Sequence, residues 1–170
     1  MSANIEIKAR IRDFSRLEAR AAALSDTPRQ LIPQDDIFFN TPRGRLKLRI
    51  LAPDRAQLVY YERPNQAGPK RSNYTILETG QPEVLRAVLE QALGVRGTVR
   101  KVRQLYLVGQ TRIHLDRVED LGDFLELEVV LAPGQGDAEG QAIARDLMLR
   151  LEVRQEDLLE GAYLDLLEQK

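Results

Sequence analysis

The stretch that decides the fold is residues 4–11, which read NIEIKARI. Isoleucine or alanine occupies every second position, and the residues between them are Asn4, Glu6, Lys8 and Arg10. Successive side chains of a β-strand point to opposite faces, so this alternation predicts a strand with one apolar face and one polar face. The same kind of pattern recurs along most of the chain.

Seven further strands are predicted from alternation, or from runs of strand-forming residues between turn residues. They lie at residues 34–40, 45–51, 58–63, 72–77, 98–108, 112–118 and 124–131. Most of the connections are short, such as 41–44 and 109–110, and short connections join antiparallel neighbours. Eight strands can close into a barrel that leaves no edge unpaired.

Helical periodicity interrupts the strands at three points and returns near the C-terminus. Apolar residues recur at helical spacing from Phe14 to Leu24, from Pro82 to Leu93, and around Leu147, and a last helix is predicted at residues 160–168. Amphipathic helices must bury their apolar stripes, so we expect them on the apolar face of the barrel wall. The predicted fold class is α+β: one domain of residues 1–170, an eight-stranded closed antiparallel β-barrel with helices packed outside.

The composition excludes several classes of function. The 25 basic and 26 acidic residues nearly cancel, which gives no sign of a nucleic-acid footprint or a polybasic membrane anchor. The chain has no cysteine, so disulfides, thiolate metal sites and cysteine nucleophiles are excluded. No segment approaches the roughly 20 apolar residues that span a bilayer. We expect a cytoplasmic protein that binds neither nucleic acid nor membrane.

The polar faces of five predicted strands carry many charged residues at a spacing of two. These residues are Glu6, Lys8, Arg45, Lys47, Arg49, Lys101, Arg103, Arg112, His114, Asp116, Glu126 and Glu128. If helices cover the outside of a barrel, these faces point inward, and a charged lumen must hold water and a charged ligand. The basic groups favour a polyanion, and the carboxylates favour Mg²⁺ or Mn²⁺ lying between them and that polyanion.

For any one of these strands taken alone, the alternative is the solvated face of an ordinary sheet. Five such faces together favour the lumen. Cations, a bridging metal and a shaped enclosure are the groups that phosphoryl-transfer chemistry needs. A GxxxxGK[ST] phosphate loop, an HExxH motif and a Ser-His-Asp pattern are all missing from the sequence, which removes the commonest other enzyme classes.

The order and spacing of these motifs resemble those of the CYTH family, the triphosphate tunnel metalloenzymes, and most closely its class IV adenylyl cyclase branch. The matching segments are residues 4–8, 34–39, 45–49, 60–64, 68–72, 100–103, 112–116 and 121–128. The family also includes thiamine triphosphatases and inorganic triphosphatases. The resemblance implies a tunnel that binds a nucleoside or inorganic triphosphate together with Mg²⁺ or Mn²⁺.

The resemblance also implies roles for individual residues. The implied metal ligands are Glu6, Asp116, Glu126 and Glu128. The implied phosphate-binding residues are Lys8, Arg45, Lys47, Arg49, Arg63, Lys101, Arg103 and Arg112. The implied catalytic residues are Glu6, Lys8, Lys101, Arg103 and Glu126.

One position departs from the family's ExExK signature, because Asn4 stands where its first glutamate is expected. An amide has lost the carboxylate's charge but still offers a carbonyl oxygen. The alternative is that Asn4 merely starts a strand at the rim of the barrel. The number of metal ions therefore stays open.

Three functions are compatible with the sequence. The first is an adenylyl-cyclase-like enzyme that converts ATP to cyclic AMP and pyrophosphate. The alternatives are a triphosphatase that hydrolyses inorganic, thiamine or nucleoside triphosphate, and a non-catalytic module that binds a nucleotide or polyphosphate. His114 is open between a general base, a metal ligand, a phosphate contact and a structural residue. Tyr60 and Tyr61 are assigned to packing rather than to base stacking, and a homodimer is left open.

Overall fold

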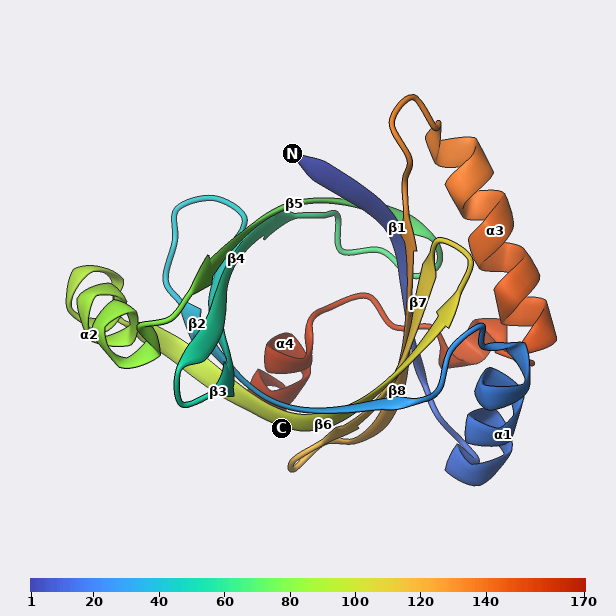
Figure 1. The fold of residues 1–170 in the computed structure, drawn as a ribbon, viewed down its shortest axis with the longest axis horizontal. Coiled ribbons are helices and arrows are strands. Elements are labelled where there is room, and N and C mark those ends of the chain that lie inside the picture. The colour runs from blue at the N-terminus through green and yellow to red at the C-terminus, as the bar shows by residue number, and fades with distance from the viewer.

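The computed structural model describes residues 1–170 and contains a closed barrel of eight antiparallel strands (Figure 1). The strands are β1 (Ser2–Arg10), β2 (Gln30–Phe39), β3 (Arg45–Ala52), β4 (Arg55–Glu62), β5 (Lys70–Thr79), β6 (Val95–Val108), β7 (Thr111–Val118) and β8 (Gly122–Val130). The helices are α1 (Phe14–Leu24), α2 (Pro82–Leu93), α3 (Asp137–Arg150) and α4 (Tyr163–Glu168), with one 3₁₀ turn, η1 (Gln155–Asp157). The predicted fold class is confirmed. None of the helices has the length and apolar character needed to cross a membrane.

The barrel closes because β1 pairs on both of its sides. The strand order is β1-β5-β4-β3-β2-β6-β7-β8, and β8 returns to pair with β1. In this closing register Glu6 lies opposite Glu128, and Lys8 lies opposite Glu126. On the other side of β1, Glu6 lies opposite Lys70 of β5. Closure thus brings charged residues from distant parts of the sequence side by side.

Most strands begin earlier than predicted, and α4 begins later. β2 begins at Gln30 rather than at residue 34 and includes Pro33, because this early part pairs with β6 before the pairing with β3 begins. A proline is tolerated where one strand edge has no partner. β5 begins at Lys70 rather than at residue 72, although the turn-forming residues 64–69 lie directly before it. α4 begins at Tyr163 rather than at residue 160.

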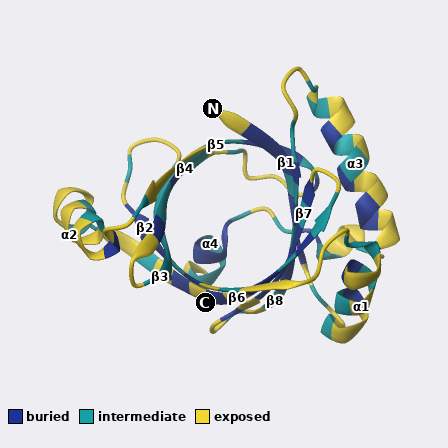
Figure 2. Ribbon diagram, viewed as in Figure 1, coloured by how far each residue is buried: buried dark blue, intermediate teal, exposed yellow.

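The main apolar core lies outside the barrel, between its wall and the helices α1 and α3. Outward side chains such as Ile7 and Leu127 pack there with Leu17 of α1 and Leu147 of α3. Full burial of each such side chain contributes about 1.5–3 kcal/mol, so the wall is stabilised from its outer face. Figure 2 shows the buried residues of α1 and α3 on the sides of the helices that face the barrel. The inner face of the wall is therefore available for polar groups.

α2 covers the wall less completely than predicted. Leu85 and Leu89 pack against the apolar cluster on the outer face of β2 and β3, but Val88 is 56% exposed. The prediction that the apolar stripe of α2 is buried is therefore wrong at Val88, because the helix packs mainly on these two strands. The ends of α2 agree with prediction. It begins at Pro82 and is followed by Gly94, whose φ of +73° suits glycine.

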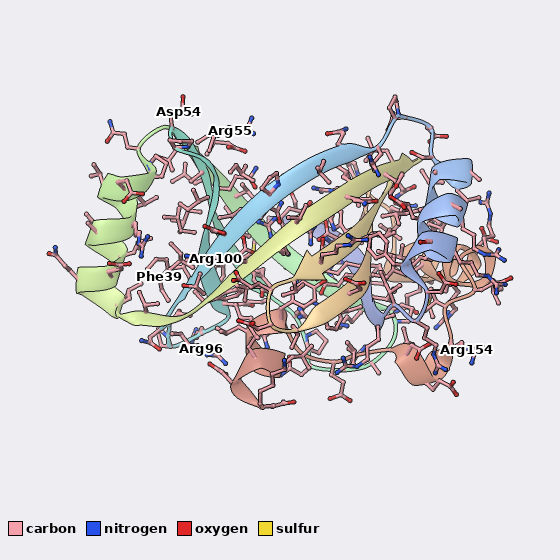
Figure 3. All side chains as sticks on the ribbon, turned by 90° about the horizontal axis from the view of Figure 1, so that it is seen from below. Phe39, Asp54, Arg55, Arg96, Arg100 and Arg154 are labelled. Atoms are coloured by element: carbon pink, nitrogen blue, oxygen red, sulfur yellow. The ribbon has the colours of Figure 1, made fainter.

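The C-terminal segment, residues 158–168, crosses one end of the barrel. Leu158 forms a β-bridge with Ala9 of β1, and further along the segment Asp165 binds Arg45 of β3. Arg96 of β6, labelled beside α4 in Figure 3, binds Asp165 as well. In the barrel order β1 lies across from β3 and β6, which both pair with β2, and Figure 1 shows α4 within the outline of the barrel. The segment therefore closes this end.

Candidate functional site

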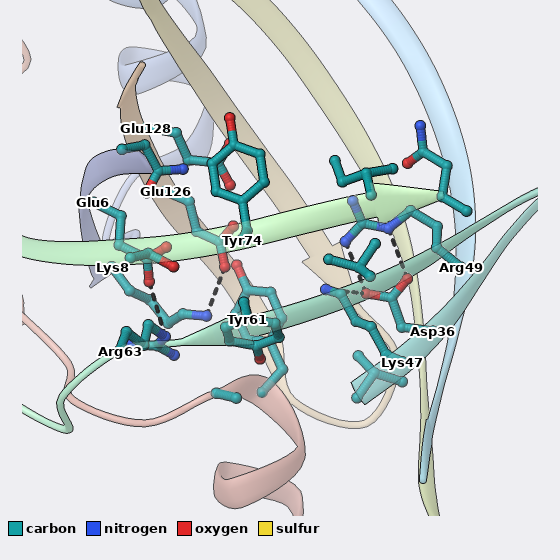
Figure 4. Close-up of a pocket in the computed structure, with 18 of the residues that line it drawn as sticks. Glu6, Lys8, Asp36, Lys47, Arg49, Tyr61, Arg63, Tyr74, Glu126 and Glu128 are labelled. Carbon is teal, nitrogen blue, oxygen red and sulfur yellow. Dashed lines mark hydrogen bonds and ion pairs between the residues drawn. The ribbon is translucent and has the colours of Figure 1, made fainter. Parts of the chain in front are cut away.

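The barrel encloses a cavity of about 150 Å³ to which every strand contributes (Figure 4). The charged residues that line it are Glu6, Lys8, Asp36, Lys47, Arg49, Arg63, Lys101, Arg112, Glu126 and Glu128. Three further residues of the predicted set, Arg103, His114 and Asp116, lie behind them and are almost completely buried. The structure thus brings nearly all the charged strand residues singled out from the sequence into one enclosure.

Glu6 of β1 and Glu126 and Glu128 of β8 gather in one half of the cavity, which we call the acidic half. His114 lies beside them, with its Nδ1 3.7 Å from Glu126 Oε2 and 3.9 Å from Glu128 Oε1. Possible ligand atoms of His114, Glu126 and Glu128 all lie within 4.8 Å of one another. His114 Nδ1 and the Oδ1 of Asn4 are buried without a hydrogen-bond partner. This set of donors fits a divalent cation.

The carboxylates of the acidic half differ in their ionisation. Burial opposes the ionisation of Glu126, but Lys8 at 2.6 Å and Arg103 at 2.8 Å outweigh it and hold its pKa well below the ordinary value. Burial raises the pKa of Glu6, and Arg63 at 3.0 Å offsets only part of this effect. The ionised form of Glu126 is therefore favoured by its surroundings, whereas that of Glu6 is disfavoured.

Asp116, an implied metal ligand, is bound instead by cations and a tyrosine. Arg103 donates to both of its carboxylate oxygens, at 2.7 and 2.6 Å, and Lys101 Nζ lies 3.4 Å from Oδ2. The hydroxyl of Tyr163 donates to Oδ2 at 2.9 Å. Asp116 has no exposed surface, and it does not belong to the group of His114, Glu126 and Glu128. Its geometry is that of a residue that orients Arg103.

The other half of the cavity, the basic half, is built around Asp36 of β2. Asp36 accepts hydrogen bonds from Lys47 at 2.9 Å and from Arg49 at 2.8 and 2.9 Å. Burial opposes its ionisation, but Arg49 and Lys47 outweigh it and hold its pKa well below the ordinary value. Lys101 Nζ lies 3.9 Å from Asp36 and links the two halves. Asp36 was not among the predicted site residues, because Phe38 on the same strand face interrupts the polar pattern.

Burial lowers the pKa of three lysines, Lys47, Lys70 and Lys101. Burial, followed by the charge of Arg49, lowers the pKa of Lys47 to about 7, although Asp36 opposes the shift. Burial, followed by the charge of Arg63, lowers the pKa of Lys70 to about 8. The ammonium of Lys70 is buried without a hydrogen-bond partner. Lys70 had no predicted role, because its position appeared to lie in a loop.

The remaining arginines of the predicted phosphate-binding set lie in different surroundings. Arg45 binds Asp165 at 3.0 Å, at the closed end of the barrel. Arg63 lies within the acidic half and is almost fully buried. Arg112 lies where the cavity opens, with its side chain 36% exposed and Nη2 3.4 Å from the hydroxyl of Tyr74. Arg45 is thus engaged in holding the C-terminal segment, whereas Arg63 and Arg112 border the cavity.

Three tyrosines line the cavity. Tyr61 does so, contrary to its assignment to packing, whereas Tyr60 bonds to Glu62 outside the cavity. Tyr74 and Tyr163 were not predicted. No alternation or motif in the sequence marks Tyr163, because it reaches the cavity only through the path of the C-terminal segment.

Comparison with known proteins supports a single family. The CYTH domain model matches residues 2–163. The fold is similar to that of the PH1012 protein of Pyrococcus horikoshii OT3, with 25% identity, a TM-score of 0.84, and coverage of 95% of this chain and 98% of that one. A conserved hypothetical protein of Pyrococcus furiosus is 21% identical, with a TM-score of 0.83, and the match covers 95% of this chain and 98% of that one. A proposed adenylate cyclase of Vibrio parahaemolyticus is 18% identical, with a TM-score of 0.78, and the match covers 97% of each chain. No curated protein sequence matches this chain.

Proposed function

Because this chain belongs to the CYTH domain family, we propose that it is a metal-dependent enzyme that converts ATP to cyclic AMP and pyrophosphate inside its barrel. The observation that carries the proposal is the enclosure itself. Fixed cations from β1, β3, β6 and β7, together with Arg63 just after β4 and a group of carboxylates, face one small cavity. Such an arrangement supplies the positioning and charge stabilisation on which phosphoryl transfer depends.

We propose that Glu6, Glu126 and Glu128 hold Mg²⁺ or Mn²⁺, with the Oδ1 of Asn4 as a neutral donor. A bound ion would act as a Lewis acid that polarises the phosphate oxygens and offsets their charge. Asp116 is left out of this set, because it has no exposed surface, does not line the cavity and is bound at both oxygens by Arg103. Its proposed role is to orient that guanidinium toward the phosphates.

The cations of both halves bind the phosphates in this proposal. A triphosphate would take over partners that now belong to Glu126 and Asp36, since Lys8, Lys47 and Arg49 are bound to those carboxylates. In cyclisation the ribose 3′-oxygen attacks the α-phosphorus, and the bond from that phosphorus to the bridging oxygen breaks. Negative charge then grows on the departing pyrophosphate, where Lys101 and Arg103 stabilise it.

Hydrolysis of the terminal phosphate is the second candidate reaction. The cavity mouth favours an organic group on the substrate, because Tyr74 lines it and Ile76 is 41% exposed beside it. However, all the charged groups of the cavity suit phosphate or metal. None of them favours a nucleoside triphosphate over an inorganic one. The amide of Gln57, a potential contact for a base, is bound to Glu78 at 2.6 Å.

One assay separates these functions. The protein is incubated with ATP, GTP, thiamine triphosphate or tripolyphosphate, in the presence of Mg²⁺ or Mn²⁺, and the products are resolved by chromatography. Cyclic AMP with pyrophosphate supports the cyclase, and released orthophosphate supports the triphosphatase. Tight binding without any product would contradict an enzyme and favour a binding module.

The affinity for a triphosphate is expected to fall as pH rises above about 7, because Lys47 then loses its proton in the free protein. A bound polyanion favours the charged ammonium, so the pKa of Lys47 rises on binding. Affinity is therefore fully present below the free-protein pKa, and it falls above it by up to about tenfold per pH unit for one linked proton. Affinities are expressed for the fully ionised phosphate chain, so the titration of the ligand itself does not enter the comparison.

Calorimetric titration with tripolyphosphate in the absence of metal measures this dependence. Lys47→Arg is the matched variant, because a guanidinium stays charged throughout the range. The affinity of Lys47→Arg should change little from about pH 7 up to about pH 8. Above that pH Lys70 also begins to lose its proton. Identical pH profiles for the wild type and Lys47→Arg would contradict the role of Lys47.

Replacing Asn4 by glutamate is expected to lower the concentration of Mg²⁺ or Mn²⁺ that half-saturates activity. Asn4 is 4% exposed and lines the same cavity as the carboxylates, so it is not a rim residue, and its Oδ1 is buried without a hydrogen-bond partner. Affinity for a hard cation increases with the number of charged ligands. Metal titrations of wild type, Asn4→Glu and Asn4→Gln provide the measurement, and Asn4→Gln should resemble wild type. Equal half-saturation in all three would place residue 4 outside the metal's ligands.

A further inference from the structure

We propose that Tyr163 is a positioning residue of the site, which sets the places of Lys8, Lys101 and Arg103. The inference rests on the proposed function, because it concerns how these cations are presented to a phosphate chain. Tyr163 comes from the C-terminal segment, and it is the first residue of α4. It is 4% exposed and forms part of the cavity lining.

The ring of Tyr163 contacts two ammonium groups. Lys8 Nζ lies 3.6 Å from the ring centroid, and Lys101 Nζ lies 4.8 Å from it. The face of an aromatic ring attracts a cation, and the attraction is strongest where water is excluded. Both lysine side chains are more than nine-tenths buried, so this condition is met.

These two lysines need such a contact because they come from separate parts of the barrel. Lys8 lies on β1 and Lys101 on β6, which are separated by β7 and β8 in the barrel order. A lysine side chain has many rotamers, and fixing it has an entropic cost. An aromatic ring can hold an ammonium without adding a negative charge. The contact therefore adds no carboxylate that a phosphate would have to displace.

The hydroxyl of Tyr163 extends the same function to Arg103. It donates to Asp116 Oδ2 at 2.9 Å, and this oxygen also accepts from Arg103 Nη2 at 2.6 Å. Asp116 is held from one side by the tyrosine and from the other by the guanidinium. One side chain thus orders three cations, two through its ring and one through a carboxylate.

A purely structural role is the competing interpretation. The ring of Tyr163 also packs against Phe124, with 5.1 Å between centroids, in a cluster with Phe38, Val99 and Leu164. Leu164 is equally buried in this cluster and has no contact with the cations, so Leu164→Ala is the matched control. It should lower stability without changing how the cations are placed.

The test compares Tyr163→Phe, Tyr163→Leu and Leu164→Ala with wild type. Thermal unfolding gives stability, and calorimetry gives the affinity for tripolyphosphate without metal. We expect Tyr163→Leu to weaken binding by about tenfold and Tyr163→Phe by less, since phenylalanine restores the ring. Leu164→Ala should bind as wild type does. In turnover, the loss should appear mainly as a higher KM.

A spectroscopic signature reports the ring contacts directly. In protein labelled with ¹³C-lysine, the Hε protons of Lys8 and Lys101 should show ring-current shifts that Tyr163→Phe retains and Tyr163→Leu removes. Wild-type affinity in Tyr163→Leu, or no such shift in the wild type, would overturn the inference and leave the proposed function intact. Failure of the wild type to bind tripolyphosphate would overturn both.

Discussion

Replacing Glu128 by glutamine is expected to lower turnover by about 100-fold or more, because a divalent cation loses one of its three charged ligands. A metal contributes several kcal/mol to transition-state stabilisation, and each 1.4 kcal/mol or so corresponds to tenfold in rate. Stability should change little. The nearest cation to Glu128 is Arg112 at 3.7 Å, so the substitution breaks no close ion pair.

Initial rates over a range of Mn²⁺ concentrations, together with thermal unfolding, provide the measurement. Glu139→Gln is the matched control, because it removes the same charge from the exposed surface of α3, outside the barrel. It should leave both quantities unchanged. Turnover of Glu128→Gln close to that of wild type would show that Glu128 holds no catalytic metal.

Replacing Arg103 by alanine should have the largest combined effect on stability and binding. It leaves the carboxylate of Asp116, which has no exposed surface, without its bidentate partner. Breaking a buried ion pair from one side costs about 3–5 kcal/mol. The affinity for tripolyphosphate should fall by tens of fold, since each charge-assisted contact contributes about 1.5–3 kcal/mol.

The double variant Arg103→Ala with Asp116→Ala separates these two effects. Removing both partners leaves neither the guanidinium nor the carboxylate of this pair without the other, so the loss of unfolding free energy should be smaller than the sum of the two single losses. Binding should not recover, because the guanidinium is still missing. Urea unfolding and calorimetry measure the two quantities. Recovered affinity in the double variant would mean that Arg103 acts on stability alone.

The sequence predicted the fold because its strands carry two kinds of information at once. Alternation in residues such as Ile5 and Ile7 identifies the strands, and the charges between them indicate an enclosed polar lumen. Helical stripes then supply the outer layer against which the apolar wall packs. These features depend on neighbouring positions only, so they can be read without coordinates.

The site was less predictable, because its details depend on contacts across the barrel. Asp116 and Glu126 appear equivalent in the sequence, yet one is bound at both oxygens by Arg103 and the other faces the cavity. Lys70 reaches the interior only because β5 begins earlier than its turn-forming neighbours suggested. Tyr163 reaches it through the path of a whole segment, and that path is a tertiary property.

The closure of the barrel through β1 has a consequence during synthesis. β1 pairs only with β5 and β8, and β8 ends at Val130. At about 5–20 residues per second, the first strand of a nascent chain waits roughly 6–25 s for its last partner. A strand that waits unpaired is exposed to aggregation and to chaperones. Glu6, Lys8 and Arg10 place a charge at every second position, which disfavours such association. The charged side chains of β1 thus also reduce aggregation of the chain before the barrel closes.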